Sequence, residues 1–151
     1  MRAGRFAVLI GFAGAALWAP VASAAVPVTT ITITVQFGGV ETFTADSDVI
    51  CDSGVAVTDP VFAAGGGVRG RGVFTFHLVK TLTCDDNSGT FKLLVDAAST
   101  PTSGGTIGGF AAGQGTGEYV GLRGGGSLVG TAFPDGTGIT DVYTGRLAIA
   151  P

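Results

Sequence analysis

The feature that most constrains the fold is a strict alternation of apolar and polar residues. In Val28–Phe37, polar residues alternate with the apolar residues Ile31, Ile33, Val35 and Phe37. Successive side chains of a β-strand point to opposite faces, so this segment predicts an antiparallel strand with one face buried and one face in solvent. Further segments of this kind are 73–84, 90–97 and 139–150. We therefore predict an all-β chain, because turn residues separate these segments.

The glycine-rich segment Gln114–Phe133 indicates that the sheet curves strongly. Seven glycines are interleaved here with residues of high β propensity, and we expect two short strands joined by a tight turn. Glycine inside strands marks bulges, sharp bends and close approach of backbones. We predict a small antiparallel β-barrel of about seven or eight strands, closed by pairing of the last strand with the first.

Three segments carry a resemblance to a family of uncharacterised small secreted proteins from high-GC Gram-positive bacteria. They are KTLTCDDNSGTFKLLV (80–95), GTGEYVGLRGGGSLVGT (115–131) and GITDVYTGRLAI (138–149). The family is loosely similar to allene oxide cyclases and dirigent proteins, so the resemblance implies a calycin-like or allene-oxide-cyclase-like antiparallel barrel. Relatives have an aromatic-rich strand between Val95 and Gly115. This chain has DAASTPTSGGTIGGFAAGQ there, with one aromatic residue, which leaves open whether 96–114 forms a barrel strand.

The first 24 residues have the layout of a secretory signal peptide. Arg2 and Arg5 precede an apolar run, and Ala22–Ala24 offers small residues for cleavage. A transmembrane anchor is the alternative, but the run is about a dozen residues long against the roughly twenty that span a bilayer. We expect a secreted protein whose mature part, residues 25–151, is a single domain without a transmembrane segment.

Charge argues against a nucleic-acid partner. The chain has 8 basic and 11 acidic residues, and two of the basic residues lie in the predicted signal peptide, so the mature protein carries a net charge of −5. Nucleic-acid binders instead present basic patches that neutralise phosphates.

Both cysteines, Cys51 and Cys84, lie in the part predicted to be exported. Thiols oxidise outside the cell, so we predict one disulfide. A reactive or metal-binding thiol pair is the alternative, but zinc needs four ligands and His77 is the chain's single histidine.

The sequence offers few candidates for catalysis or metal binding. The serine-hydrolase, zinc-protease and phosphate-loop motifs are absent, and His77 shows no nearby acid in sequence, which makes it a poor general base. The spacing of Glu118, Asp96 and Asp141 does not show that these acids converge as glycoside hydrolysis requires. A further acidic series, Asp46, Asp48, Asp52 and Asp59, lacks the EF-hand order and is better explained by turns. We predict no catalytic residues, no metal site and no cofactor.

Lys80 and Asp141 are each the single charge on an otherwise apolar strand face. Since an unpaired buried charge is costly, we expect them to pair with each other or with other polar groups, or to lie at a rim where lysine can reach water. If buried, they form a polar pair in the lumen.

Two classes of function remain. We favour non-catalytic binding of a small apolar ligand or a cell-envelope partner, because small barrels enclose such ligands. The alternative, implied by the resemblance, is a cofactor-free isomerase or cyclase, or a dirigent-like enzyme, that acts in the lumen. A closed, apolar interior favours binding or a structural role, whereas an open pocket with convergent charged groups favours an enzyme. The sequence does not indicate the oligomeric state.

Overall fold

The computed structural model describes residues 25–59, 63–64, 73–99 and 105–151. The predicted signal peptide, residues 1–24, lies outside the described residues. The strands are β1 (Val28–Gln36), β2 (Glu41–Asp46), β3 (Ser53–Asp59), β4 (Ala63–Ala64), β5 (Phe74–Cys84), β6 (Thr90–Ser99), β7 (Gly105–Gly113), β8 (Leu122–Ala132) and β9 (Gly138–Ile149). A single 3₁₀ turn, η1 (Gly117–Tyr119), is the one helical element among the described residues.

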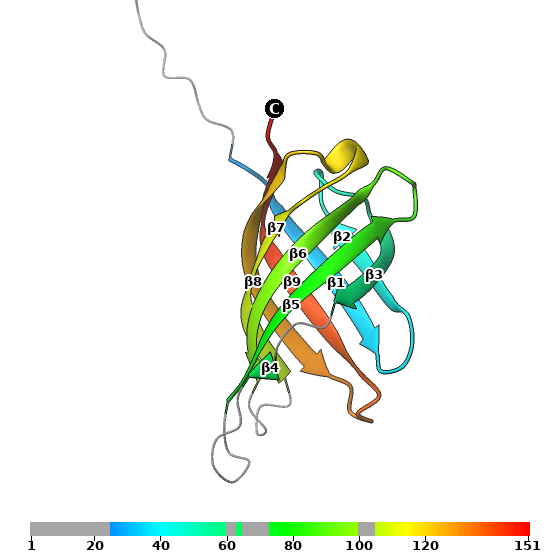
Figure 1. Cartoon of the computed structure of the whole chain (residues 1–151), viewed down its shortest axis with the longest axis vertical. Coiled ribbons are helices and arrows are strands. Elements are labelled where there is room, and N and C mark those ends of the chain that lie inside the picture. Colours follow the sequence, from blue (N-terminus) through cyan, green and yellow to red (C-terminus); the bar gives the residue numbers. More distant parts are fainter. Residues whose placement is uncertain (1–24, 60–62, 65–72, 100–104) are drawn as a thin grey trace, which may run out of the picture.

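The described strands form a closed antiparallel barrel of eight strands (Figure 1). β1, β2 and β3 pair in chain order, β3 pairs with β5, and β5 to β9 again pair in chain order. β9 then pairs with β1 from Val28↔Arg146 to Gln36↔Gly138, which closes the ring. The short β4 pairs with the same edge of β5 as β3 does. The predicted all-β barrel, including the pairing of its first and last strands, is confirmed.

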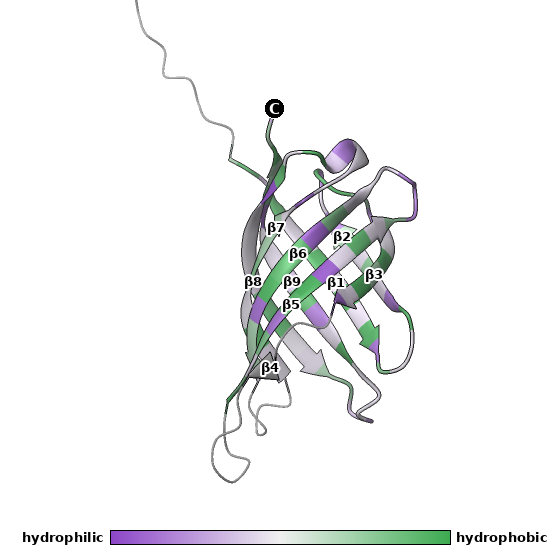
Figure 2. Cartoon of the chain, viewed as in Figure 1, coloured by the Kyte–Doolittle hydropathy of each residue, from purple (hydrophilic) through white to green (hydrophobic). Residues whose placement is uncertain are grey.

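Burial follows the alternation seen in the sequence. In β1, Ile31 and Ile33 are fully buried while Thr30, Thr32 and Thr34 are partly exposed. In β6, Phe91, Leu93, Val95 and Ala97 are buried and alternate with less buried residues, although apolar and polar residues do not alternate strictly along this strand (Figure 2). Phe37, which the alternation placed on the inner face, instead lies in the turn after β1 and is 68% exposed.

The glycine-rich segment does not form the predicted pair of short strands. It forms η1 and then one long strand, β8. Gly117, Gly121 and Gly124 have φ of +59°, +82° and +142°, so conformations that favour glycine occur both before β8 and at the first residue of the cluster 124–126. The cluster serves close packing: a Cβ at Gly126 would lie 2.1 Å from the carbonyl oxygen of Thr144 on β9.

The segment between Val95 and Gly115 does contribute a barrel strand, β7, which pairs with β6 on one side and β8 on the other. Its glycines permit close approach as well, since a Cβ at Gly108 would lie 2.2 Å from the carbonyl oxygen of Asp96. The strand therefore combines glycines, where neighbouring backbones come close, with one large core residue, Phe110.

The predicted disulfide is present. Cys51, in the loop after β2, bonds to Cys84 at the end of β5, with the Cα atoms 6.0 Å apart. Beside it, the Tyr119 hydroxyl of η1 accepts a hydrogen bond of 3.0 Å from the Cys51 backbone N–H. We call this the disulfide end of the barrel, at the top in Figure 1, and we call the opposite end, with turns 37–40 and 133–137, the open end.

Candidate functional site

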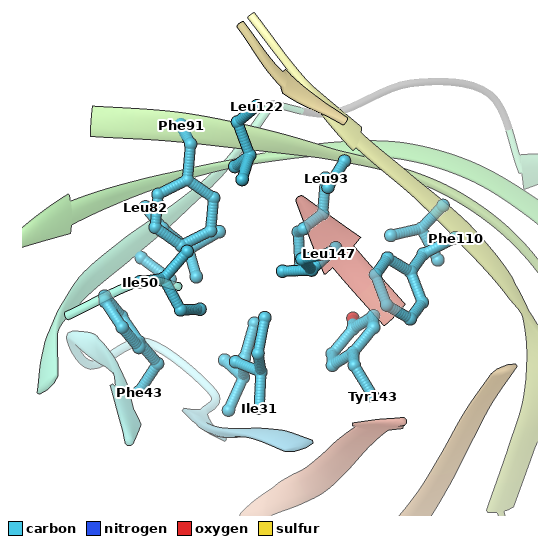
Figure 3. Close-up of a cluster of buried hydrophobic side chains, with 14 of the residues drawn as sticks. Ile31, Phe43, Ile50, Leu82, Phe91, Leu93, Phe110, Leu122, Tyr143 and Leu147 are labelled. Carbon is cyan, nitrogen blue, oxygen red and sulfur yellow. The ribbon is translucent and has the colours of Figure 1, made fainter. Parts of the chain in front are cut away.

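Toward the disulfide end, large apolar side chains fill the lumen (Figure 3). Aromatic rings meet edge to face, with centroids 6.2 Å apart for Phe43 and Phe91 and 5.3 Å apart for Phe91 and Tyr119. The residues labelled in this cluster are Ile31, Phe43, Ile50, Leu82, Phe91, Leu93, Phe110, Leu122, Tyr143 and Leu147. This part of the lumen is a packed core.

Toward the open end, the lumen holds a pocket of about 340 Å³. Each of the eight barrel strands, together with the turn residue Phe37, contributes at least one residue to its wall. The lining residues are Val35, Phe37, Glu41, Thr58, Phe76, Leu78, Lys80, Ala97, Thr106, Leu128, Ile139 and Asp141. The volume falls at the lower end of the range of about 300–1,000 Å³ that small-molecule sites occupy.

Small side chains make room for this pocket. Ala97 on β6 and Thr106 on β7 line the wall, where the core has residues such as Phe91 and Phe110 on the same two strands. Gly130 on β8 leaves space for a carboxylate, since a Cβ there would lie 2.4 Å from Asp141 Oδ1. The pocket thus results from a change in side-chain size along the barrel strands.

A buried ion pair lies in the pocket wall. Lys80 is 2% exposed, and its Nζ donates hydrogen bonds to Glu41 Oε2 at 2.9 Å and to Thr58 Oγ1 at 2.7 Å. The Thr58 hydroxyl in turn donates to the Glu41 carboxylate. Thr58 faces Lys80 directly in the β3–β5 register. The lysine and the glutamate neutralise each other, with the hydroxyl between them.

Asp141, at 7% exposure, is the one carboxylate among the buried residues of the described part of the chain. Its Oδ2 accepts one long hydrogen bond, 3.4 Å, from the Tyr143 hydroxyl. Burial raises the pKa of Asp141 above its ordinary value, although the positive charge of Lys80 acts in the opposite direction. Burial, followed by the charge of Asp141, also raises the pKa of Tyr143, so its phenol remains a protonated donor.

Lys80 and Asp141, the two residues singled out from the sequence, both line this pocket. The ion-pair partner of Lys80 is Glu41, which the sequence analysis missed. A signal was available: Glu41 lies two residues before the buried Phe43, and residues two apart in a strand share a face.

His77 lies on the outer wall, where it faces Asp96 directly in the β5–β6 register. The two side chains are hydrogen-bonded and are 59% and 81% exposed. The interpretation of His77 as a histidine without a nearby acid is therefore wrong. The pair is open to solvent and lies on the other side of the wall from Lys80 and Asp141.

Potential metal ligands come close together at one place in the described part of the chain. The one close set of His, Cys, Asp or Glu atoms there comprises Cys51, Cys84 and Asp86, and the disulfide consumes both cysteines. A surface hollow of about 550 Å³ at the disulfide end is lined by the acidic residues Asp48, Asp52, Asp85, Asp86 and Glu118 among others. Of the acids considered for calcium, only Asp48 and Asp52 reach this hollow.

Comparisons of the chain with protein-family models, with curated proteins and with solved structures found no match. Among the residues that the structure describes, no helix has the length and hydropathy needed to cross a membrane.

Proposed function

We propose that the protein binds one small, largely apolar ligand in the lumen pocket at the open end of the barrel. The pocket itself is the observation that carries this proposal: about 340 Å³, with a mostly apolar wall and a few buried polar groups. Such a combination is typical of small-molecule sites, in which apolar surface gives affinity and a few polar groups fix orientation. Eight-stranded barrels are wide enough to hold one small ligand.

The proposed setting is extracellular. The layout of residues 1–24 and the resemblance to secreted proteins support this location, and the Cys51–Cys84 bond is compatible with an oxidising compartment. We accordingly propose a secreted binding protein of the allene-oxide-cyclase-like barrel type.

A cofactor-free isomerase or cyclase is the second candidate, and Asp141 is the observation that favours it. Charged groups do converge on an open pocket, which is the arrangement expected of an enzyme. Lys80 and Glu41, however, are engaged with each other. Asp141 is the remaining carboxyl group, and burial raises its pKa, which suits a general acid or base. Binding ranks first because it requires no further acid or base.

Titration with the neutral fluorescent probe N-phenyl-1-naphthylamine tests the binding proposal. We expect saturable fluorescence enhancement with one site per chain. Thr106→Phe, which fills the pocket, should weaken binding at least about tenfold, since a bulky group there occupies the ligand's volume. Ile107→Phe is the matched control, because Ile107 follows Thr106 in β7 but is 68% exposed on the outer wall. Equal affinity of both variants for the probe would exclude the lumen as the site.

Mass spectrometry of small molecules that co-purify with the protein tests the enzyme proposal. A recovered compound is incubated with fresh protein and analysed by chromatography for an isomer of unchanged mass. Conversion that Asp141→Asn abolishes would establish the isomerase. Recovery of the compound unchanged would leave binding as the function.

A further inference from the structure

The charges that line the lumen pocket do not balance. Among the described lining residues, Lys80 is the one cation, whereas Glu41 and Asp141 are both acids. Lys80 and Glu41 form an ion pair at 2.9 Å, with side chains 3% and 17% exposed. The pair is therefore neutral as a unit, and the charge left in the pocket is that of Asp141.

The surroundings of Asp141 offer it little compensation. On the adjacent strands, its register partners are Ile33 of β1 and Gly130 of β8, neither of which carries a charge. Across the pocket, Lys80 is already bonded to Glu41 and Thr58. From the described side chains it receives one hydrogen bond, at 3.4 Å from the Tyr143 hydroxyl. Within the described residues, no cation lies in ion-pairing distance of this carboxylate.

We propose that the ligand carries a protonated amine that pairs with Asp141, while its apolar body lies against Leu78, Leu128 and Ile139. This inference rests on the proposed function and specifies the ligand class. A buried carboxylate is costly unless a cation or several donors satisfy it, and an ammonium group supplies both the charge and the donors. A carboxylate ligand would instead add a third negative group to the pocket. Phe37 and Phe76 also line the pocket, and an ammonium group is attracted to the face of an aromatic ring.

Displacement of N-phenyl-1-naphthylamine by three eight-carbon competitors tests the proposal. Octan-1-amine, octan-1-ol and octanoate share one apolar chain and differ in the head group. At pH 7.5 we expect the amine to bind about tenfold more tightly than the alcohol, as a charged hydrogen bond in a desolvated site allows, and octanoate to bind most weakly. Equal affinities, or preference for octanoate, would overturn the amine proposal while leaving lumen binding intact. Failure of the probe itself to bind would instead contradict the proposed function.

Asp141→Asn identifies the group responsible. It should reduce the affinity for the amine to that for the alcohol and leave the alcohol unchanged. Asp96→Asn is the control of equal charge, because Asp96 lies on the outer wall with 81% of its side chain exposed; it should keep the tenfold preference. A preference that persists in Asp141→Asn would overturn the assignment.

The pH dependence of the wild-type protein gives a second readout that needs no variant. The groups that face Asp141 are Lys80, Glu41 and Tyr143. As the pH falls through the raised pKa of Asp141, the carboxylate becomes neutral while the amine stays charged, so the preference for amine over alcohol should decrease. A preference that increases on acidification would contradict the proposal.

Discussion

The two halves of the barrel lumen are built from the same strands but differ in what their inner faces carry. On β5, Leu82 is fully buried in the core, Lys80 lies in the ion pair, and Leu78 is partly exposed on the pocket wall. These three residues share one face at intervals of two. The difference teaches that the inner face of a single strand stabilises the fold at one end and forms a binding surface at the other. Substitutions in the two halves should therefore have separable effects.

The largest expected effect comes from a matched pair of substitutions on β5. Leu82→Ala should lower the free energy of unfolding by about 3–5 kcal/mol, because it leaves a cavity in a packed core. Leu78→Ala should cost less than about 2 kcal/mol, since this side chain already borders open space. Urea denaturation measures both. Similar losses at the two positions would mean that the two halves do not differ in packing.

Removal of the disulfide tests the same comparison at the disulfide end of the barrel. Cys51→Ala/Cys84→Ala should lower the free energy of unfolding by about 3–4 kcal/mol, as expected for a bond that closes a loop of 33 residues. Affinity for N-phenyl-1-naphthylamine should stay unchanged at temperatures where the variant is folded, because the pocket lies at the other end. Weakened probe binding by the folded variant would show that the two ends are coupled.

A double-mutant cycle on the ion pair tests the open half. Glu41→Gln should cost about 3 kcal/mol, because it leaves the Lys80 ammonium buried without its carboxylate. Glu41→Gln/Lys80→Met should cost less than the sum of the single variants, since it removes both charges. Thermal or urea denaturation measures the free energy of unfolding of Glu41→Gln, of Lys80→Met and of the double variant. The exposed His77–Asp96 pair is the reference, and Asp96→Asn should change stability little. Additive effects at Lys80 and Glu41 would show that the interaction between them contributes no more to stability than that of the surface pair.

The smallest expected effect is the pH dependence due to Asp141. Its pKa is higher in the folded protein than in the unfolded chain, so the folded state binds more protons between the two values. The contribution of Asp141 to the free energy of unfolding should consequently decrease as pH rises through this window. Asp141→Asn should remove that slope and be the more stable protein at pH 7. Denaturation at a series of pH values measures the difference, and a variant less stable than the wild type at pH 7 would show that the ionised carboxylate is favourable in the fold.

Alternation accounts for what the sequence could predict. It placed Lys80 and Asp141 on inner faces, since a period of two fixes the face of every residue in a strand once its apolar residues are assigned. It did not reveal which charges meet across strands, because that depends on register. The turn after Cys84 sets the pair Thr83↔Thr90, and counting back from it places His77 opposite Asp96.

The glycines were the hardest feature to interpret. Gly124, Gly125 and Gly126 lie inside β8, where neighbouring backbones come close, and not in the predicted turn. Local sequence does not distinguish a glycine needed for a turn from one needed for close approach, since the second requirement is set by another strand. For the same reason, the glycines of 105–113 left open whether this segment forms a strand.

The seam between β1 and β9 has a consequence for how the protein folds. β9 follows every other barrel strand in the chain, and its pairing with β1 joins residues as far apart as Val28 and Arg146. Pairings between distant segments form slowly, because a long loop must be closed before any contact compensates for the lost entropy. Asp141 lies within this seam, opposite Ile33, whereas Glu41 and Lys80 belong to strands joined by shorter connections. The chain should therefore become competent to capture its ligand only in the closing step, and a nascent, open sheet would not hold one.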